Sequence, residues 1–514
     1  MAWDWHVTEV PFSPVDDADW RLLHTLRPTD WQNPTPNGTY NLVVLGGGTA
    51  GLVCAVGAAG LGAKVALVER HLLGGDCLNF GCVPSKALLA AAHGAFAARN
   101  QFAPAGDASA QPDFGAAMAW VRERRAKIAP HDGAARVSGE GVDVFLGAGR
   151  FTAPDRISVG DTELSFKKAV IATGGRAGVP PIDGLEGVPY LTNETVFSLT
   201  EAPRHLLVIG AGPIGCELSQ AMRRLGCEVT LLDRDARILP KDDERAANIL
   251  LETLTREGVR VTLHVDILSA AVAPNASSGD GVRLTIRSRD SGEERAIEGS
   301  HLLIAAGRVP NVKDIGLEVA GVAFDERKGI TVDDQLCTTN SNIYAAGDVA
   351  SPLQFTHMAD AMARNVLRNA FFFGHAKTSS LVVPWATYTD PEVAHVGVTH
   401  QQAEAEGLES LEVDLSSLDR AILEGIEQGF ARAYYDGKGH VRGATIVAPR
   451  AGDLIGELTL AVTHGMTLGQ LASVIHPYPS QGEISKKLGD AYMRTRLTPR
   501  VKGLFERWFR FLRR

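Results

Sequence analysis

Cysteine is scarce in this sequence, with six residues in a chain of 514. So few cysteines cannot build the disulfide framework of a small secreted domain. The first residues, MAWDWHVTEV, also lack the pattern of a cleavable signal peptide. We therefore expect a cytoplasmic protein, and in a reducing compartment a bridging cysteine pair is more often catalytic than structural.

An excess of positive charge is absent as well. Lys and Arg number 51 against 60 Asp and Glu, a formal charge of −9, which gives no drive towards nucleic acid. Residues 42–63 carry no charge and are long enough to span a bilayer. However, this stretch holds seven glycines and divides into strand, turn and helix. We expect it to belong to an α/β domain and not to a membrane span.

Glycine, in contrast, is abundant, and one cluster follows an apolar strand. In GGGTAG, Gly46, Gly48 and Gly51 fit the spacing GxGxxG, and Glu69 ends the next predicted strand. The first glycine permits a tight turn, the second lets the backbone approach a pyrophosphate, and the third lets helix pack on strand. A carboxylate at the position of Glu69 suits ribose hydroxyls. Taken alone, the motif is a weak signal, and a glycine-rich turn that binds no ligand is the alternative.

The same pattern recurs 164 residues later. HLLVIGAGPIG supplies Gly210, Gly212 and Gly215, and the following strand ends at Asp233. The third glycine precedes the acid by 18 residues in both copies, so coincidence is a poor explanation. The repeat predicts two bound dinucleotides, which suggests a nicotinamide hydride donor and a flavin acceptor.

Three further stretches read as buried strands that run into glycine turns. They are VIATGG with Thr173 and Gly174, LLIAAGR with Gly307, and NIYAAGD with Asp348. The carboxylate of Asp348 suits the hydroxyls of a ribityl chain, although an acid that only closes a turn is the alternative. These turns are further candidates for flavin or nicotinamide contacts.

The segment GGDCLNFGCVPSK places Cys77 and Cys82 five residues apart. In a regular helix their Cα atoms would be roughly 8.5 Å apart, whereas a disulfide needs less than about 7 Å. If they bridge, this turn cannot be regular helix. Pro84 suits the first turn of a helix that starts just after Cys82, and Lys86 and a helix N-terminus both favour a thiolate. Zinc is not expected, because the sequence has no second cysteine pair or suitably spaced His.

Together, GGDCLNFGCVPSK, the two glycine motifs and NIYAAGD resemble the flavin-dependent pyridine nucleotide–disulfide oxidoreductases, which include dihydrolipoamide dehydrogenase, glutathione reductase and mercuric reductase. The likeness covers about residues 41–495. It implies two doubly wound α/β dinucleotide-binding domains, for FAD and NAD(P), and an α+β C-terminal domain that forms a homodimer. The expected segments are a 1–40 extension, FAD-binding 41–187, NAD(P)-binding 188–304, a central return to the flavin at 305–378, a dimerisation domain 379–497 and a basic helix 498–514.

The resemblance also implies roles for individual residues. Cys82 matches the thiol on the flavin side and Cys77 the thiol that meets the substrate. Lys86 matches a lysine beside the flavin, and Glu217 matches its carboxylate partner. Two further family positions contact the FAD: they correspond to Gly149 and to the backbone of Thr356. The remaining cysteines have no partner at motif spacing and are read as core: Cys54, Cys216, Cys227 and Cys337.

The identity of the coenzyme depends on the end of the second motif. Asp233 can accept from a free ribose 2′-OH and would repel a 2′-phosphate, which favours NADH. Arg234 and Arg237 follow and would soften that repulsion, so NADPH stays open. Pro213 stands where glutathione reductase has a tyrosine over the nicotinamide site.

The family pattern breaks in the segment IHPYPSQGE. The thiol-handling members have a His-Pro pair in the partner subunit, and a glutamate five residues after the histidine orients its ring. Alignment of Glu483 on that glutamate places Tyr478 at the histidine position, with His476 two residues earlier. A tyrosine, with a reference pKa of about 10, is a poor acid–base group near neutrality.

Mercuric reductases also carry a tyrosine at this position, and soft ions prefer thiolates. The expected function is therefore reduction of a soft metal ion, or of another acceptor that needs no imidazole. The vicinal cysteine pair with which mercuric reductases usually end is missing, since no cysteine follows Cys337. Open alternatives are a disulfide reductase that uses His476, an NAD(P)H dehydrogenase for quinone-like acceptors, and a flavoprotein whose redox state gates binding.

The two ends lie outside the likeness. Residues 1–40 carry Trp3, Trp5, Trp20 and Trp31, which are expected to dock on the enzyme's own surface or to cover a partner. Residues 501–512 place apolar side chains at helical spacing, and residues 500–514 hold six basic residues and one acid. This pattern predicts an amphipathic helix that packs on the dimer or lies peripherally on an anionic membrane.

Overall fold

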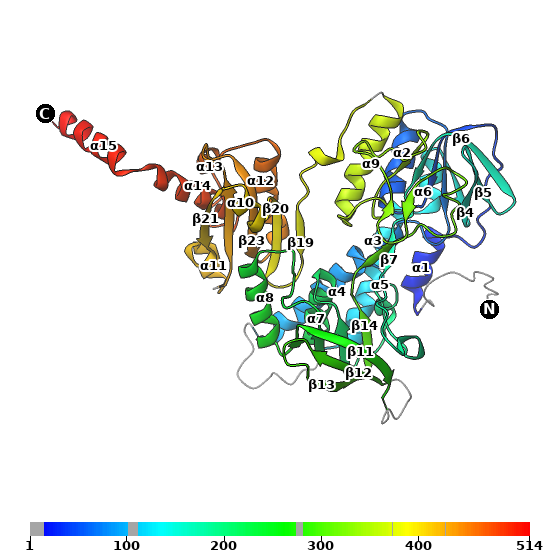
Figure 1. The fold of residues 1–514 in the computed structure, drawn as a ribbon, viewed down its shortest axis with the longest axis horizontal. Helices are drawn as coiled ribbons and strands as arrows, with labels where there is room; N and C mark the ends of the chain where they lie inside the picture. The colour runs from blue at the N-terminus through cyan, green and yellow to red at the C-terminus, as the bar shows by residue number, and fades with distance from the viewer. Residues whose placement is uncertain (1–14, 101–111, 274–280, 373, 427, 514) are drawn as a thin grey trace. The chain divides into compact units, whose positions relative to one another are not determined.

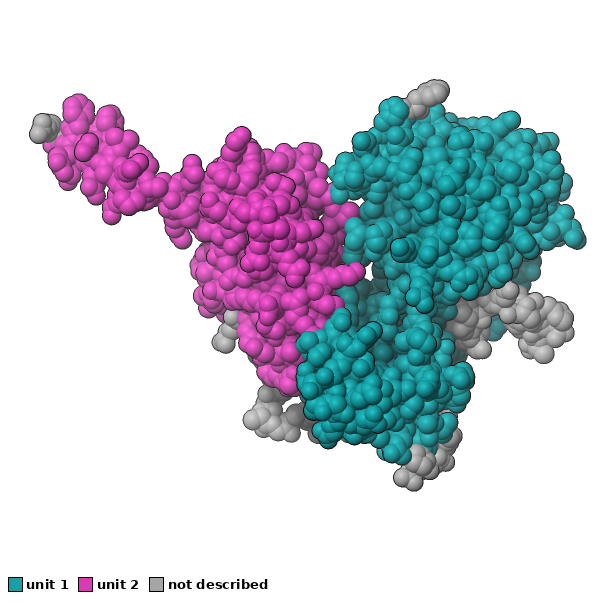
Figure 2. All heavy atoms as spheres, in the orientation of Figure 1, with its two compact units in different colours: residues 1–236, 258–381 teal, residues 237–257, 382–514 magenta. Residues whose placement is uncertain are grey.

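A computed structural model describes the chain except for residues 1–14, 101–111, 274–280, 373, 427 and 514 (Figure 1). The chain divides into two compact units (Figure 2). Unit 1 comprises residues 1–236 and 258–381, and unit 2 comprises residues 237–257 and 382–514. The first unit holds both glycine motifs and the cysteine pair, and the second holds Tyr478.

The largest sheet of unit 1 contains the first glycine motif at the end of a central parallel strand. Its order is β3-β2-β1-β6-β5-β4, with β18 also paired to β6. The strands β3, β2, β1, β6 and β18 are parallel, and β4 and β5 extend β6 in antiparallel fashion. The strands span β1 Tyr40–Leu45, β2 Val65–Glu69, β3 Val142–Leu146, β4 Gly149–Ala153, β5 Arg156–Val159, β6 Thr162–Ile171 and β18 Ile343–Ala345.

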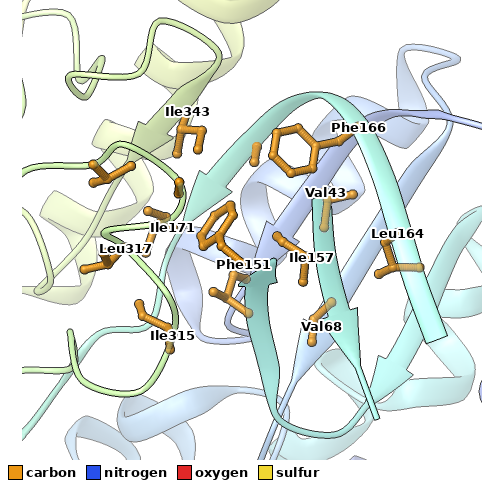
Figure 3. Packing of buried hydrophobic residues seen from close by; sticks show 14 of the residues in the cluster. Val43, Val68, Phe151, Ile157, Leu164, Phe166, Ile171, Ile315, Leu317 and Ile343 are labelled. Carbon is orange, nitrogen blue, oxygen red and sulfur yellow. The ribbon is translucent and has the colours of Figure 1, made fainter. Parts of the chain in front are cut away.

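A hydrophobic core fixes the register of this sheet (Figure 3). Side chains from β1, β2, β4, β5, β6 and β18 converge on it, together with Ile315 and Leu317 from the connecting segment. Phe151 and Phe166 meet edge to face, with ring centroids 6.1 Å apart. Burial of each phenyl ring stabilises the fold by about 1.5–3 kcal/mol. Ile343 brings the later part of the chain, including Asp348, back to the first sheet.

The second glycine motif lies in a separate parallel sheet with order β10-β9-β8-β14. A three-stranded antiparallel sheet, β11-β12-β13, and two short pairs, β7 with β15 and β16 with β17, complete the strands of unit 1. The bounds are β7 Gly175–Ala177, β8 His205–Ile209, β9 Glu228–Leu232, β10 Arg260–Thr262, β11 Val265–Val272, β12 Val282–Ser288, β13 Glu294–Gly299, β14 His301–Ile304, β15 Arg308–Pro310, β16 Phe324–Asp325 and β17 Gly329–Ile330.

The helices of unit 1 carry the cysteines and the N-terminal extension. They are α1 Asp17–Leu26, α2 Thr49–Gly60, α3 Gly75–Asn79, α4 Cys82–Asn100, α5 Phe114–Ile128, α6 Ala134–Gly139, α7 Pro213–Arg224 and α9 Thr356–Phe371. The N-terminal extension packs on its own unit, which was one of the two alternatives expected for it. Helix α1 buries Leu22, Leu23 and Leu26, and the indole of Trp31 donates to the carbonyl of Val144 at 3.2 Å. Trp20 is exposed; Trp3 and Trp5 lie outside the described residues.

Unit 2 is an α+β domain built on one antiparallel sheet, with order β19-β20-β23-β22-β21. The sheet and its helices span α8 Glu244–Arg256, β19 Trp385–Thr387, β20 Glu392–Gly397, α10 His400–Ala405, β21 Glu409–Asp414, α11 Asp419–Leu423, β22 Phe430–Tyr435, β23 Val441–Ala448, α12 Ala451–Thr463, α13 Leu468–Ala472, α14 Glu483–Arg496 and α15 Pro499–Leu512. Helix α12 packs on β20 and β23. The expected fold class, doubly wound α/β units followed by an α+β domain, is confirmed. Among the helices in the described ranges, none has the length and apolar character needed to cross a bilayer.

Candidate active site

The two cysteines lie at a break between two helices. Helix α3 ends at Asn79 and α4 begins at Cys82, so the turn is not regular helix. A side chain at Gly81 would bring its Cβ within 3.1 Å of the Asp76 carbonyl and 3.3 Å of the Cys77 Cα. Glycine therefore allows the chain to fold back on itself here. Cys77 is half-buried, and Cys82 is exposed.

The two sulfurs differ in their electrostatic environment. The pKa of Cys82 is lowered to about 6, chiefly by a hydrogen bond with Cys77 and then by Thr356 and the positive charge of Lys86, against the opposing effect of burial. The Thr356 Oγ1 lies 3.3 Å from the Cys82 Sγ. The same hydrogen bond, followed by burial, raises the pKa of Cys77. Near neutrality this arrangement holds Cys82 as a thiolate and Cys77 as a thiol.

Lys86 and Glu217, which are 131 residues apart, form an ion pair across two helices of unit 1. The Lys86 Nζ lies 2.8 Å from Glu217 Oε2. Lys86 is one turn after Cys82 on α4, and Glu217 is almost completely buried on α7. The pair orients the lysine towards the helix that carries the motif at residues 210–215.

Sequence reasoning missed a second ion network beside the cysteines. Arg308 contacts Asp76 at 3.1 Å and Asp348 at 3.2 Å. Asn193 also donates to Asp76, at 2.8 Å. Asp76 precedes Cys77 directly, so the network links the cysteine turn to the candidate ribityl-binding carboxylate. The only signal in the sequence was the position of Arg308 immediately after Gly307.

The first glycine motif forms a cradle that side chains would fill. A Cβ on Gly46 would lie 2.3 Å from the carbonyl oxygen of Ala172, and one on Gly51 would lie 1.8 Å from that of Gly46. In contrast, a Cβ on Gly48 would meet only the Gly75 Cα, at 3.7 Å. No side chain caps the N-terminus of α2. Free backbone N–H groups beside an open Gly48 fit the pyrophosphate of a dinucleotide.

The second motif repeats this geometry. A Cβ on Gly210 would lie 2.5 Å from the Ala305 carbonyl oxygen, and one on Gly215 would lie 1.8 Å from that of Gly210. Gly212 faces open space, and α7 begins without a side-chain cap. The residues therefore fit two nucleotides, one at each motif.

Glu69 and Asp233, the acidic residues at the end of the second strand of each glycine motif, also share a role that the sequence did not reveal. Glu69 accepts from the backbone N–H of Gly47 and of His71, each at 2.6 Å. Asp233 accepts in the same way from Ala211 and, at 2.8 Å, from Asp235. Each carboxylate thus uses both oxygens to hold its own glycine turn.

The remaining candidate cofactor residues lie on the same unit. Thr173 donates to the carbonyl of Asn311 at 2.7 Å. Gly174 and Gly307 have φ of 66° and 112°, in the region that favours glycine. A Cβ on Gly149 would lie 2.5 Å from Leu45 Cδ1, so that glycine is needed for strand packing.

In unit 2, Tyr478 and His476 lie two residues apart in the proline-containing segment, but their side chains have different surroundings. The hydroxyl of Tyr478 donates to Asp419 Oδ2 at 2.7 Å, and its side chain is exposed. The ring of His476 is mostly buried, and its Nε2 lies 3.0 Å from Glu457 Oε2. Glu483 begins α14 and accepts from the Ser480 N–H at 3.5 Å. The segment therefore presents the tyrosine outwards and turns the histidine inwards.

The other cysteines are mostly core residues, as expected. Cys54, Cys216 and Cys227 are buried, whereas Cys337 is only partly buried. The described residues contain no group of three or more His, Cys, Asp or Glu that could hold a metal ion.

Comparison with known proteins agrees with these features. The family model described as pyridine nucleotide-disulphide oxidoreductase matches residues 40–363, and the dimerisation domain of the same family matches residues 383–488. A mercuric reductase of Bacillus cereus is 33% identical over 93% of this chain and 75% of its own length. A dihydrolipoyl dehydrogenase of Thermus scotoductus is 34% identical over 87% of this chain and 95% of its own length.

Solved structures give the same result. A copper(II) complex of the HOCl-induced flavoprotein disulfide reductase RclA from Escherichia coli superposes with a TM-score of 0.78 at 27% identity, over 88% of this chain and 99% of that one. LpdA from Mycobacterium tuberculosis also gives a TM-score of 0.78, at 28% identity, over 87% of this chain and 98% of that one. The chain therefore belongs to the FAD-dependent pyridine nucleotide–disulfide oxidoreductase family.

Proposed function

We propose that this protein is an NAD(P)H oxidoreductase that passes electrons through Cys77 and Cys82 to a soft metal ion such as Hg(II), or to another acceptor that needs no imidazole. The observation that carries the proposal is that the position expected for the acid–base histidine is an exposed tyrosine, Tyr478, in a chain whose Cys82 has a pKa lowered to about 6. When bound, FAD supplies the chemistry that accepts hydride from the nicotinamide and passes the two electrons to the cysteine disulfide. Two electrons open the disulfide, and the same two reduce the acceptor as the disulfide re-forms.

The first glycine motif is the proposed FAD site. Its open Gly48 and uncapped helix α2 would receive the pyrophosphate, and Glu69 would accept from the ribose. Asp348 is the proposed ribityl contact, held by Arg308. Lys86 and Thr356 would then lie beside the isoalloxazine ring because both are next to Cys82 in the structure.

NADH is the proposed coenzyme at the second motif. Asp233 brings a negative charge to the position that a 2′-phosphate would occupy. The guanidinium of Arg237 already donates to the carbonyls of Pro240 and Asp242, at 2.9 and 3.2 Å. Arg234 is exposed, and its nearest acidic contact is Asp266, at 3.8 Å.

Tyr478 of the partner subunit is the proposed residue facing the dithiol in a homodimer. Its hydrogen bond to Asp419 raises the pKa of Tyr478, so the hydroxyl stays protonated at neutral pH. A protonated tyrosine can donate a hydrogen bond to a bound acceptor but cannot shuttle protons as imidazole does. His476 is engaged by Glu457 within its own unit, which argues against its use as the proton carrier.

Two observations favour a second candidate, a disulfide reductase related to dihydrolipoyl dehydrogenase. A named relative of that activity is 34% identical, and the His476 Nδ1 is buried without a hydrogen-bond partner. Rotation of the proline segment on dimer formation would be needed to release the ring from Glu457.

An acceptor screen separates the two candidates. FAD-loaded wild type, Tyr478→Phe and His476→Ala are assayed with NADH against Hg(II), lipoamide, glutathione disulfide and a soluble quinone. The proposal expects Hg(II) turnover that falls about tenfold or more in Tyr478→Phe and changes little in His476→Ala, in line with loss of one acceptor contact. Fast lipoamide turnover that only His476→Ala abolishes would select the second candidate instead.

A further inference from the structure

The last helix, α15, has no described partner in its own chain. None of its residues is buried, although it carries large apolar side chains. Six of them are between 47% and 67% exposed: Leu504, Phe505, Trp508, Phe509, Phe511 and Leu512. A soluble protein rarely leaves so compact an apolar set in water unless a partner covers it. The helix also lies beyond residue 488, where the match to the family dimerisation domain ends.

Apolar and polar residues are completely separated around this helix. At about 100° per residue, the apolar side chains fill one arc roughly 160° wide, and the opposite arc holds the charged residues. Lys502 and Arg513 border the apolar arc on one side, and Arg500 and Arg507 border it on the other. Arg510 lies at the centre of the polar face, near the single acid, Glu506. The apolar arc is therefore bordered by positive charge along both edges.

We propose that α15 docks this enzyme on the surface of an anionic phospholipid membrane. Aromatic residues spread across the apolar arc suit the boundary between headgroups and acyl chains. Basic side chains at both edges reach the phosphate layer when the helix lies flat. A protein surface would need an acidic rim of matching shape, whereas an anionic bilayer offers negative charge on both sides of the helix. At 14 residues, the helix is too short to span a membrane and suits a position in its plane.

Co-sedimentation of the full-length, FAD-loaded protein with lipid vesicles tests the proposal. One set of vesicles is an equimolar mixture of phosphatidylglycerol and phosphatidylcholine, and the other is phosphatidylcholine alone. We expect pelleting with the anionic vesicles only, and a decrease as salt is raised, because exposed charges are screened. Absence of pelleting with anionic vesicles at low salt would overturn the proposal.

Matched variants separate the two faces of the helix. Phe505→Ser/Trp508→Ser removes two large aromatic side chains from within the apolar arc and is expected to abolish pelleting. Lys502→Gln/Arg507→Gln removes one positive charge from each edge of the apolar arc and should weaken partitioning by roughly 25-fold, at roughly fivefold for each charge. Leu61→Ser removes an apolar side chain that is 62% exposed elsewhere and should pellet like wild type. Unchanged pelleting of both helix variants would contradict the proposal.

The alternative partner for the apolar face of α15 is the second subunit of a dimer. Deletion of 498–514 should leave the oligomeric state and the NADH-dependent turnover in solution unchanged while it abolishes vesicle binding. If the deletion instead converts a dimer to monomers in analytical ultracentrifugation, the apolar face belongs to the dimer and the membrane proposal is wrong.

Discussion

Asp19 and Arg125 form an ion pair that is sealed from water, with both side chains 1% exposed and Nη2 and Oδ1 2.7 Å apart. Arg125 also donates from Nη1 to the carbonyl of Asn79, at 2.9 Å. Asn79 lies between the two cysteines, and Asp19 lies in the extension that precedes the family match at residue 40. The extension thus contacts the cysteine turn through one guanidinium.

Removal of one partner from this pair should destabilise the protein strongly. Asp19→Asn leaves Arg125 buried with an unbalanced charge, and we expect a loss of about 3–5 kcal/mol in the free energy of unfolding. Asp17→Asn, in the same helix but with no such partner among the described contacts, is the matched control and should change stability by less than about 0.5 kcal/mol. Urea denaturation measures both, and equal effects would show that the buried pair has no special role.

Cys82 should react as a thiolate well below the pH at which an ordinary cysteine does. Because alkylation requires the thiolate, its rate should rise with pH with a midpoint at about 6. Cys77→Ser and Thr356→Val each alter a hydrogen bond that lowers the pKa of Cys82 and should move the midpoint upwards. Mass spectrometry of iodoacetamide-treated, reduced protein gives the rate at each pH. A midpoint above 8 in the wild type would contradict the assigned environment.

Local patterns predicted the glycine turns because each position has a short-range cause, such as the close approach of Gly51 to the Gly46 carbonyl. The helix break between the cysteines was expected only if the two residues bridge, because five residues of regular helix hold them too far apart for a disulfide. The contact between Lys86 and Glu217 came only from family resemblance, and the network of Arg308, Asp76 and Asp348 was missed. These ion pairs join residues on separate elements of the chain, so no local periodicity encodes them.

Paired glycine substitutions should separate folding from nucleotide binding. In Gly215→Ala the new Cβ would lie 1.8 Å from the Gly210 carbonyl oxygen, so the turn must open and the melting temperature should fall. In Gly212→Ala nothing lies within 4 Å, so the melting temperature should hold. The added methyl would occupy the space proposed for the pyrophosphate, and the KM for NADH should rise about tenfold, roughly 1.4 kcal/mol. Scanning calorimetry and steady-state kinetics measure the two effects, and an unchanged KM in Gly212→Ala would place the nucleotide elsewhere.

Asp233→Asn should shift the coenzyme preference towards NADPH. The amide oxygen can still accept from the backbone of Ala211, while the hydrogen bond from Asp235 is lost together with the negative charge. We expect kcat/KM for NADPH to rise about tenfold, through loss of repulsion with the 2′-phosphate. Glu228→Gln, on the neighbouring strand β9 but paired to Arg260, is the control. A wild type that already prefers NADPH would overturn the proposed role of Asp233.

Anaerobic titration of the purified, FAD-loaded protein with NADH tests the central claim most directly. If the cysteines take part, the wild type consumes two electron pairs per FAD, one for the flavin and one for the disulfide, and Cys77→Ser consumes one. Consumption of a single pair by the wild type, or of two pairs by Cys77→Ser, would remove these cysteines from the path of the electrons.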